Sequence, residues 1–276
     1  MARHTTQLED MHAPFQGANI MGTQFLSALL YVSAAIFVIG MGCRIYFWVC
    51  APVPLKIVLT PAPKHIPGVI RRLTEEVFGF RALAKADRSL WIPAWLFHFS
   101  LVLLFLGHLG GLVIPHLAQT ALGLNENQFE GMAQVVGGAV GLLAFVMLFW
   151  LLIRRLILPR VRWISTFSDY FAPVLLLLIL ATGNPMRFMG GLNIAQAQSF
   201  IAGWLALHPV APPSDPVFTA HILLVCVLLI YIPFSKLVHI GGVGALSPTL
   251  NQRNNPREHR YVNSWNKANE NSPTSS

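Results

Sequence analysis

Residues 218–242 read FTAHILLVCVLLIYIPFSKLVHIGG, an almost entirely apolar stretch with a histidine near each end, His221 and His239. At 1.5 Å per residue, a helix of this length exceeds the ~30 Å hydrocarbon thickness of a bilayer. The stretch therefore predicts a membrane-spanning helix. Ionisable side chains are rare inside the membrane and usually face the protein interior or a functional site. Two histidines in one span thus predict a site within the membrane.

The rest of the chain has the same apolar character. It is 276 residues long, 54% hydrophobic and only 11% charged. The apolar stretches that could cross a bilayer lie at about 23–49, 92–115, 132–157, 168–184 and 217–241. The fourth is the weakest, because it is short and contains Pro173. We predict an all-α integral membrane protein with five transmembrane helices.

Three regions are predicted along the chain: a tail at 1–22, a membrane domain at 23–245 and a polar tail at 246–276. The membrane domain includes a long basic link at 51–90. In that link, TPAPKHIPGVIRRL (60–73) favours irregular structure, whereas TEEVFGFRALAKADRSLW (74–91) favours a short amphipathic helix. We expect no cleavable signal peptide and no soluble catalytic domain.

The lysines and arginines are distributed unevenly between the two sides of the membrane. Sixteen lie in the link 51–90, the turn 154–163 and the stretch from Lys236 onward, whereas only Arg3 and Arg187 fall in segments of the other side. Positively charged loops remain cytoplasmic. We therefore expect a periplasmic N-terminus and a cytoplasmic C-terminus. The net charge of +8 reflects this topology, and we expect no nucleic-acid partner.

The second span carries two further histidines, His98 and His108. It runs antiparallel to the fifth, so His108 falls at the outer level with His221, and His98 at the inner level with His239. Two facing imidazoles are the axial ligands of a six-coordinate haem iron. We predict two b-type haems at two depths. The three cysteines form no CxxC or CxxCH motif, so neither an Fe–S cluster nor a covalently attached haem is expected.

Helical geometry supports this pairing only in part. Eighteen residues make five turns, which places His221 and His239 on one face, whereas ten residues place His98 and His108 ~80° apart. The corresponding rises are ~27 Å and ~15 Å. Tilted helices and a kink at Pro233 would have to absorb the difference. One alternative stays open: a non-haem transporter or membrane anchor whose histidines serve protons or packing.

The sequence resembles a known family of membrane cytochromes. FHFSLVLLFLGHLGGLVIPH (97–116), MAQVVGGAVGLLAFVMLFWLLIRRLILPRVR (132–162) and AHILLVCVLLIYIPFSKLVHI (220–240) resemble the gamma subunit of respiratory nitrate reductases, the NarI type. The resemblance covers roughly residues 90–245 and includes the histidine spacings. It implies five spans, two haems, quinol oxidation near the outer haem and electron transfer to a cytoplasmic Fe–S partner.

One departure favours a related family. The link 51–90 is unlike the compact nitrate reductase loop and is more similar to the DsrM type, a cytochrome b subunit of the sulfite-reductase-associated membrane complex. That resemblance implies an electron-transfer subunit between (mena)quinone and a cytoplasmic Fe–S protein, with further membrane or periplasmic redox subunits. It implies the cytoplasmic membrane of a bacterium or archaeon. A nitrate reductase gamma subunit is the alternative, and the direction of electron flow stays open.

Other side chains are candidates for contacts with haem propionates or quinone. Arg187 and Asn184 lie at the predicted outer end of the fourth span, where Arg187 could instead anchor at the lipid headgroups. Arg154 and Arg155 lie at the inner end of the third span, where they could neutralise propionates or set topology. No residue is predicted to be catalytic, because terminal substrate chemistry falls to partner subunits.

Overall fold

The computed structural model describes residues 2–50, 63, 65–188, 192–239 and 242, with backbone only for 2–21. Within these residues the chain is helical, without β-strands. The chain divides into two compact units, Met1–Gly40 with Ser89–Leu237 and Met41–Arg88 with Val238–Ser276. Each unit is described by itself. The predicted tail 246–276 lies outside the described residues.

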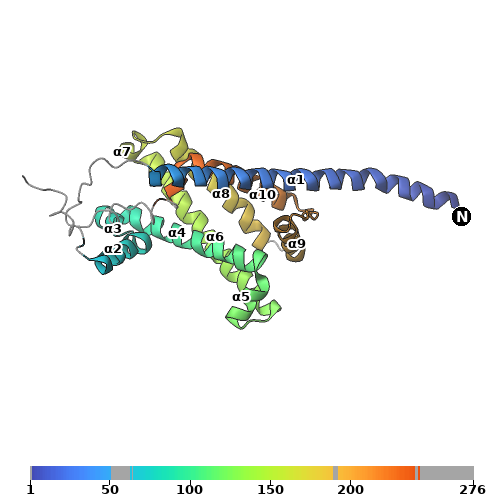
Figure 1. Cartoon of the computed structure of the whole chain (residues 1–276), viewed down its shortest axis with the longest axis horizontal. Helices are drawn as coiled ribbons and strands as arrows, with labels where there is room; N and C mark the ends of the chain where they lie inside the picture. Colours follow the sequence, from blue (N-terminus) through green and yellow to red (C-terminus); the bar gives the residue numbers. More distant parts are fainter. Residues whose placement is uncertain (1, 51–62, 64, 189–191, 240–241, 243–276) are drawn as a thin grey trace, which may run out of the picture. The chain divides into compact units, whose positions relative to one another are not determined.

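Among the described residues, five helices are long and apolar enough to cross a membrane, which confirms the predicted fold class (Figure 1). The chain is a multi-pass membrane protein. The spans are Gly22–Cys50 within α1 (Ala2–Cys50), α4 (Arg88–His108) with the π-helical turn Leu109–Val113, α6 (Glu126–Ile157), α8 (Phe167–Phe188), and α10 (Pro216–Tyr231) with the 3₁₀ turn Ile232–Phe234.

Helix α8 is longer than the predicted fourth span because neither of its internal prolines ends it. It continues through Pro173 and Pro185 to Phe188. Proline removes one backbone hydrogen bond, and membrane helices tolerate this where neighbouring helices cover the freed group. The extra turn keeps Asn184 and Arg187 on a helix, so their positions are fixed relative to the rest of α8.

Helices α6 and α8 approach closely through glycines on α6. A Cβ atom added at Gly138 would lie 2.8 Å from the ring of Phe188. A Cβ added at Gly141 would collide with the Asn184 side chain. Small residues at helix interfaces allow close backbone approach in membranes. A cluster of Phe97, Ala144, Leu148 and Leu180 joins α4 to this pair.

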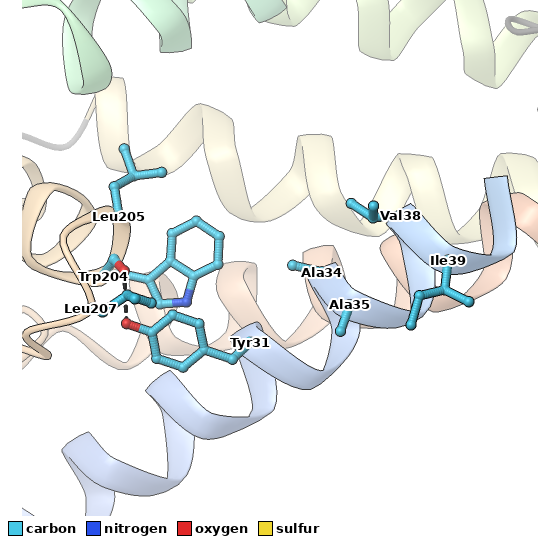
Figure 2. A pocket seen from close by; sticks show the side chains of 8 residues that line it. All are labelled: Tyr31, Ala34, Ala35, Val38, Ile39, Trp204, Leu205 and Leu207. Atoms are coloured by element: carbon cyan, nitrogen blue, oxygen red, sulfur yellow. Dashed lines mark hydrogen bonds between the residues drawn. The ribbon is translucent and has the colours of Figure 1, made fainter. Parts of the chain in front are cut away.

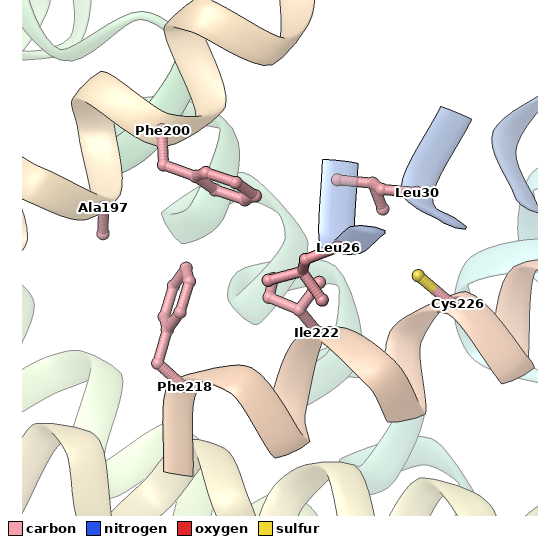
Figure 3. Packing of buried hydrophobic residues seen from close by; sticks show 7 residues of the cluster. All are labelled: Leu26, Leu30, Ala197, Phe200, Phe218, Ile222 and Cys226. Atoms are coloured by element: carbon pink, nitrogen blue, oxygen red, sulfur yellow. The ribbon is translucent and has the colours of Figure 1, made fainter. Parts of the chain in front are cut away.

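A second apolar core joins α1, α10 and α9 (Ile194–Leu205) (Figure 3). Phe200 of α9 and Phe218 of α10 meet edge to face with ring centroids 5.8 Å apart. Ile222 and Cys226 of α10 face Leu26 and Leu30 of α1 in the same cluster, as Figure 3 shows. Ile222 follows His221 directly, so this packing fixes the rotation of α10 at the histidine.

The fifth span differs from its prediction. The regular α-helix ends at Tyr231 rather than continuing to about 241, and two 3₁₀ turns follow, Ile232–Phe234 and Lys236–Val238. Pro233 has no backbone N–H to continue the α-helical ladder. It also packs close to Gly40 of α1, where an added Cβ would lie 2.7 Å from the proline Cβ. The five regular turns expected between His221 and His239 are therefore interrupted at Pro233.

Short helices occupy the links of the larger unit. They are α5 (Pro115–Leu122), α7 (Pro159–Arg162) and α9, which packs against the π-helical turn after His108. Gln198 of α9 donates a 2.9 Å hydrogen bond to the Gly111 carbonyl in that turn. Asn125 and Gln128 form a capping box that begins α6. The link after α4 is thus fixed at both of its ends.

In the link 51–90, the predicted helix boundaries were wrong. A helix, α2 (Ile66–Gly79), begins inside the segment expected to be irregular, and a second, α3 (Arg81–Ala86), follows after Phe80. Proline is tolerated in a first helical turn, so Pro67 does not prevent α2. Phe80 has φ 49°, which breaks the expected single helix. Glu75 accepts a hydrogen bond from Arg71 and pairs with Arg81, and these contacts hold its pKa below the ordinary value.

Candidate functional site

His221 of α10 is held by a threonine of α8. The distance between Thr182 Oγ1 and His221 Nδ1 is 2.9 Å. The next residue, Gly183, leaves room for the ring, because an added Cβ would lie 3.2 Å from His221 Cε1. Since α8 packs directly against α10, these contacts fix the orientation of the imidazole and leave Nε2 outside the hydrogen bond.

The two histidines of α4 are oriented in the same way by their own helix. His98 Nδ1 lies 2.7 Å from the Ala94 carbonyl, and His108 Nδ1 lies 2.7 Å from the Leu104 carbonyl. A carbonyl oxygen only accepts hydrogen bonds, so Nδ1 must carry the proton in both rings. In a neutral ring with this tautomer the lone pair is on Nε2, which is the form of imidazole that binds a metal.

The structure places two of the four predicted ligands within electrostatic range of each other. His108 and His221 come from α4 and α10, and their rings are close enough to interact electrostatically. The π-helical turn Leu109–Val113 begins immediately after His108, and such turns occur frequently at functional sites. His98 and His239 fall in different units of the chain, so their pairing stays a prediction.

The donor set fits a haem iron. Six-coordinate haem takes only two axial ligands from the protein, and three of the four predicted histidines have Nδ1 hydrogen-bonded. Among the described residues, no three histidine, cysteine, aspartate or glutamate side chains lie together as a metal-binding group. Two imidazoles from separate helices match the predicted chemistry and require no such group.

Asn184 and Arg187 follow on α8, one and four residues after Gly183, which lies against His221. Asn184 packs against Gly141 of α6, and Arg187 Nε lies 3.9 Å from a Cβ added at Gly137. The Arg187 side chain is partly buried and interacts electrostatically with Glu130. Arg187 therefore lies against α6 and is not fully exposed. This placement favours a role toward a bound anion or quinone over an interfacial anchor.

Arg155 contributes to a polar network at the opposite end of α8. It donates a 2.8 Å hydrogen bond to Ser165 Oγ and lies 3.6 Å from Asp169 Oδ1. Asp169 also accepts hydrogen bonds from Lys236 Nζ, at 2.8 and 2.9 Å, and from Thr166. Arg155 thus has protein partners that account for its position without a ligand. The structure does not bring Arg154 and Arg155 to the His108–His221 pair.

An apolar pocket of about 460 Å³ lies apart from these histidines, between α1 and the end of α9 (Figure 2). Tyr31 stacks on Trp204 with ring centroids 5.3 Å apart and donates a 2.7 Å hydrogen bond to its carbonyl, as Figure 2 shows. Alanine and aliphatic side chains complete the lining, and no histidine is among the lining residues that the structure describes. The pocket is therefore distinct from the histidine pair.

The sequence analysis missed two residues of the site, Thr182 and Gly183. Both belong to the polar interruption ATGN near the end of α8, which the sequence marks only as a break in an apolar run. A small polar pair inside a predicted span is a usable signal, because polar side chains in spans usually contact another helix. The partner of Thr182 lies 39 residues away in the sequence, so the contact itself could not be predicted.

Comparisons with known proteins identify the family of the chain. The sequence profile of the nitrate reductase gamma subunit family matches residues 64–246. The chain belongs to this family. The match begins well before the residues that carried the resemblance in the sequence analysis, and it includes most of the link 51–90 together with all four predicted histidine ligands.

The relatives of the chain include a menaquinol oxidoreductase subunit as well as nitrate reductase chains. The chain is 32% identical to the Hdr-like menaquinol oxidoreductase cytochrome b-like subunit of Archaeoglobus fulgidus, over 90% of this chain and 85% of that protein. It is 30% identical to the nitrate reductase gamma chain of Bacillus subtilis, over 63% of this chain and 83% of that protein. It is 31% identical to the respiratory nitrate reductase 1 gamma chain of Escherichia coli, over 54% and 69%.

Proposed function

We propose that this chain is the dihaem cytochrome b subunit of a respiratory complex, transferring electrons between the membrane quinone pool and a cytoplasmic Fe–S protein. His108 and His221 would hold one haem iron toward the periplasm, and His98 and His239 the other toward the cytoplasm. Haem supplies reversible one-electron transfer when it is bound. Terminal substrate chemistry would belong to partner subunits, including other membrane or periplasmic redox subunits.

The observation that carries this proposal is the shared state of two histidines on separate helices. His108 and His221 each engage an acceptor or hydroxyl through Nδ1, so that Nε2 lies outside that hydrogen bond. Histidines that ligate metals almost always use one ring nitrogen for the metal and the other for a hydrogen bond. A histidine that only joined two helices would need no such common arrangement, so the transporter or anchor alternative is disfavoured.

The share of this chain that aligns with each relative favours a complex of the Hdr-like, DsrM type over a nitrate reductase. The Hdr-like relative from Archaeoglobus fulgidus aligns with 90% of the chain, against 63% for the nitrate reductase chain of Bacillus subtilis. We infer menaquinone as the quinone, a heterodisulfide-reductase-like Fe–S protein as the cytoplasmic partner, and a sulfur compound as the terminal substrate. A respiratory nitrate reductase remains the second candidate, supported by the same family match.

Arg187 and Asn184 are proposed to contact a haem propionate or the quinone next to the His108–His221 pair. Their support is the partial burial of Arg187 against α6 and the packing of Asn184 against Gly141. A guanidinium in that position can form paired hydrogen bonds to a carboxylate. Arg154 and Arg155 are weaker candidates at the cytoplasmic end, because Arg155 already pairs with Ser165 and lies near Asp169.

The proposal is tested by haem stoichiometry in the purified protein. We expect two b-type haems per chain by pyridine haemochrome analysis of wild type, falling to about one in His108→Ala. The matched control is His208→Ala, because His208 lies in an exposed link after α9, where its Nδ1 contacts the Ala206 carbonyl. That variant should keep both haems. A well-folded wild type without haem would overturn the cytochrome assignment.

The kind of complex is tested separately by affinity purification of the chain from its native membranes. Copurification of heterodisulfide-reductase-like Fe–S subunits is expected, together with reduction of the haem absorption bands by a menaquinol analogue. Copurification of molybdenum-containing nitrate reductase subunits would instead support the second candidate. Either result leaves the haem ligands to be decided by the spectra above.

A further inference from the structure

The hydroxyl of Thr182 faces three polar atoms but has only one proton. Thr182 Oγ1 lies 3.0 Å from the Leu178 carbonyl, 2.9 Å from the Ile179 carbonyl and 2.9 Å from His221 Nδ1. The two carbonyl oxygens can only accept a hydrogen bond. The hydroxyl proton is therefore directed at the helix backbone, and a lone pair of the oxygen faces the imidazole.

An acceptor facing Nδ1 selects one tautomer of His221. The ring must then carry its proton on Nδ1 and keep the lone pair on Nε2. This is the state that the Ala94 and Leu104 carbonyls impose on His98 and His108 within α4. His221 differs from both, because its acceptor is a side chain on another helix.

We propose that Thr182 is a positioning residue for the haem ligand His221, holding the Nδ1–H tautomer through an interhelical hydrogen bond in a space that Gly183 keeps open. The inference rests on the proposed function. The Thr182 bond fixes the ring, while the adjacent Ile222 in the α1–α9–α10 core fixes its helix. The ligand is thus oriented before haem enters.

The hydrogen bond also has an electronic consequence. Donation from Nδ1–H to an acceptor makes the imidazole a more basic ligand, which stabilises ferric over ferrous iron. Losing the acceptor should therefore raise the midpoint potential of the haem that His221 binds and weaken the binding of that haem. Loss of such supporting partners typically lowers affinity ~10–100-fold.

Three variants test the inference in the full-length protein in detergent. Thr182→Val replaces the hydroxyl with a methyl group of similar size, and Thr182→Ser restores an acceptor. The matched control is Thr219→Val, because Thr219 lies two residues before His221 and its hydroxyl contacts the Asp215 carbonyl. The readouts are a redox titration of both haems and the rate of haem transfer to apomyoglobin. The relevant haem is the one absent from His108→Ala.

We expect Thr182→Val to raise the potential of that haem alone and to speed its loss ~10–100-fold, with Thr182→Ser and Thr219→Val close to wild type. An unchanged potential and rate in Thr182→Val would overturn the inference. So would equal shifts in both haems, because a general loss of packing would affect both. Failure of Thr182→Ser to restore the wild-type potential would also contradict it.

If Thr182→Val does not fold, Gly183→Ala provides the second test. Its methyl group would press on His221 Cε1, so the same haem should shift while the other stays unchanged. No shift would contradict the proposed positioning. The failure of the proposed function is recognised separately, because wild type would then contain no haem at all, whatever the Thr182 variants do.

Discussion

The two ends of helix α8 are built from different interactions. At the Phe167 end, Asp169 joins Lys236, Arg155 and Thr166 in a network of charges and hydroxyls. At the Phe188 end, α8 lies directly on the glycines of α6, and a hydrogen bond between Thr182 and His221 joins α8 to α10.

This difference indicates separate tasks for the two ends. Long charged side chains tolerate small movements, because they can follow one another through their rotamers, and a network near the membrane surface remains partly solvated. Close packing on glycine leaves no such freedom. The rigid end is the one that orients His221. We therefore infer that α8 is anchored electrostatically at one end and fixed sterically at the other.

The largest loss of stability is expected from breaking the close packing between α6 and α8. Gly141→Val would place a branched side chain where Asn184 now lies, and overpacking of this kind costs about 1–3 kcal/mol. The control is Gly131→Val on the same helix, where an added Cβ would meet nothing within 4 Å. Thermal unfolding in detergent should show a lower Tm for Gly141→Val only. Equal losses in both variants would refute the steric role of this end.

A smaller loss of stability is expected at the charged end of α8, where Asp169 pairs with Lys236. Asp169→Asn keeps the shape of the side chain but removes the charge that pairs with Lys236, and we expect about 1–2 kcal/mol of destabilisation. The Asp169 side chain is only 9% exposed, whereas that of Lys236 is 67% exposed. Lys236→Gln should therefore cost less, about 0–1 kcal/mol.

Asp169→Asn also tests whether the two ends of α8 act independently, through the midpoint potential of the haem. If the two ends have separate tasks, Asp169→Asn should leave the potential of the haem bound by His108 and His221 unchanged while it lowers Tm. A shift in that potential as large as that of Thr182→Val would show that the two ends are coupled.

Tyr231→Phe tests the neutral contacts near the charged end. The Tyr231 hydroxyl lies 2.6 Å from Ser168 Oγ and 3.3 Å from the Ser168 carbonyl, and it links α10 to the first turn of α8. Removing one such hydrogen bond costs about 0.5–1.5 kcal/mol. The measurement is the midpoint of thermal unfolding, with Ser168→Ala as the matched variant. If the two losses were fully additive in the double variant, the bond would contribute nothing to stability.

The smallest effect is expected outside the spans, at Glu75. Its folded pKa is lowered by Arg71 and Arg81, so its contribution to stability is present above its ordinary pKa and is lost as the pH falls through the folded value. Glu75→Gln should therefore lower Tm slightly at pH 7 and leave it equal to wild type once Glu75 is protonated. A difference that grows on acidification would contradict the direction of this shift.

Several features could be predicted from the sequence for definite reasons. The five spans follow from runs of apolar residues, since only a helix satisfies its own backbone in lipid. His98 and His108 were identified because ionisable residues in such runs are rare, and the hydrogen bonds of their rings lie within α4 itself. The link 51–90 was harder, because local signals of proline and glycine do not say whether a proline begins or ends a helix.

The sequence by itself determined the membrane fold, the family and the four candidate ligands, because each depends on the composition or spacing of neighbouring residues. Only the tertiary structure decided that Thr182 contacts His221 across 39 residues, that Gly141 receives Asn184, and that α10 ends at Tyr231 with Pro233 against Gly40. The physical reason is range: burial in lipid acts on each helix alone, whereas the orientation of a ligand depends on which side chains two packed helices bring together.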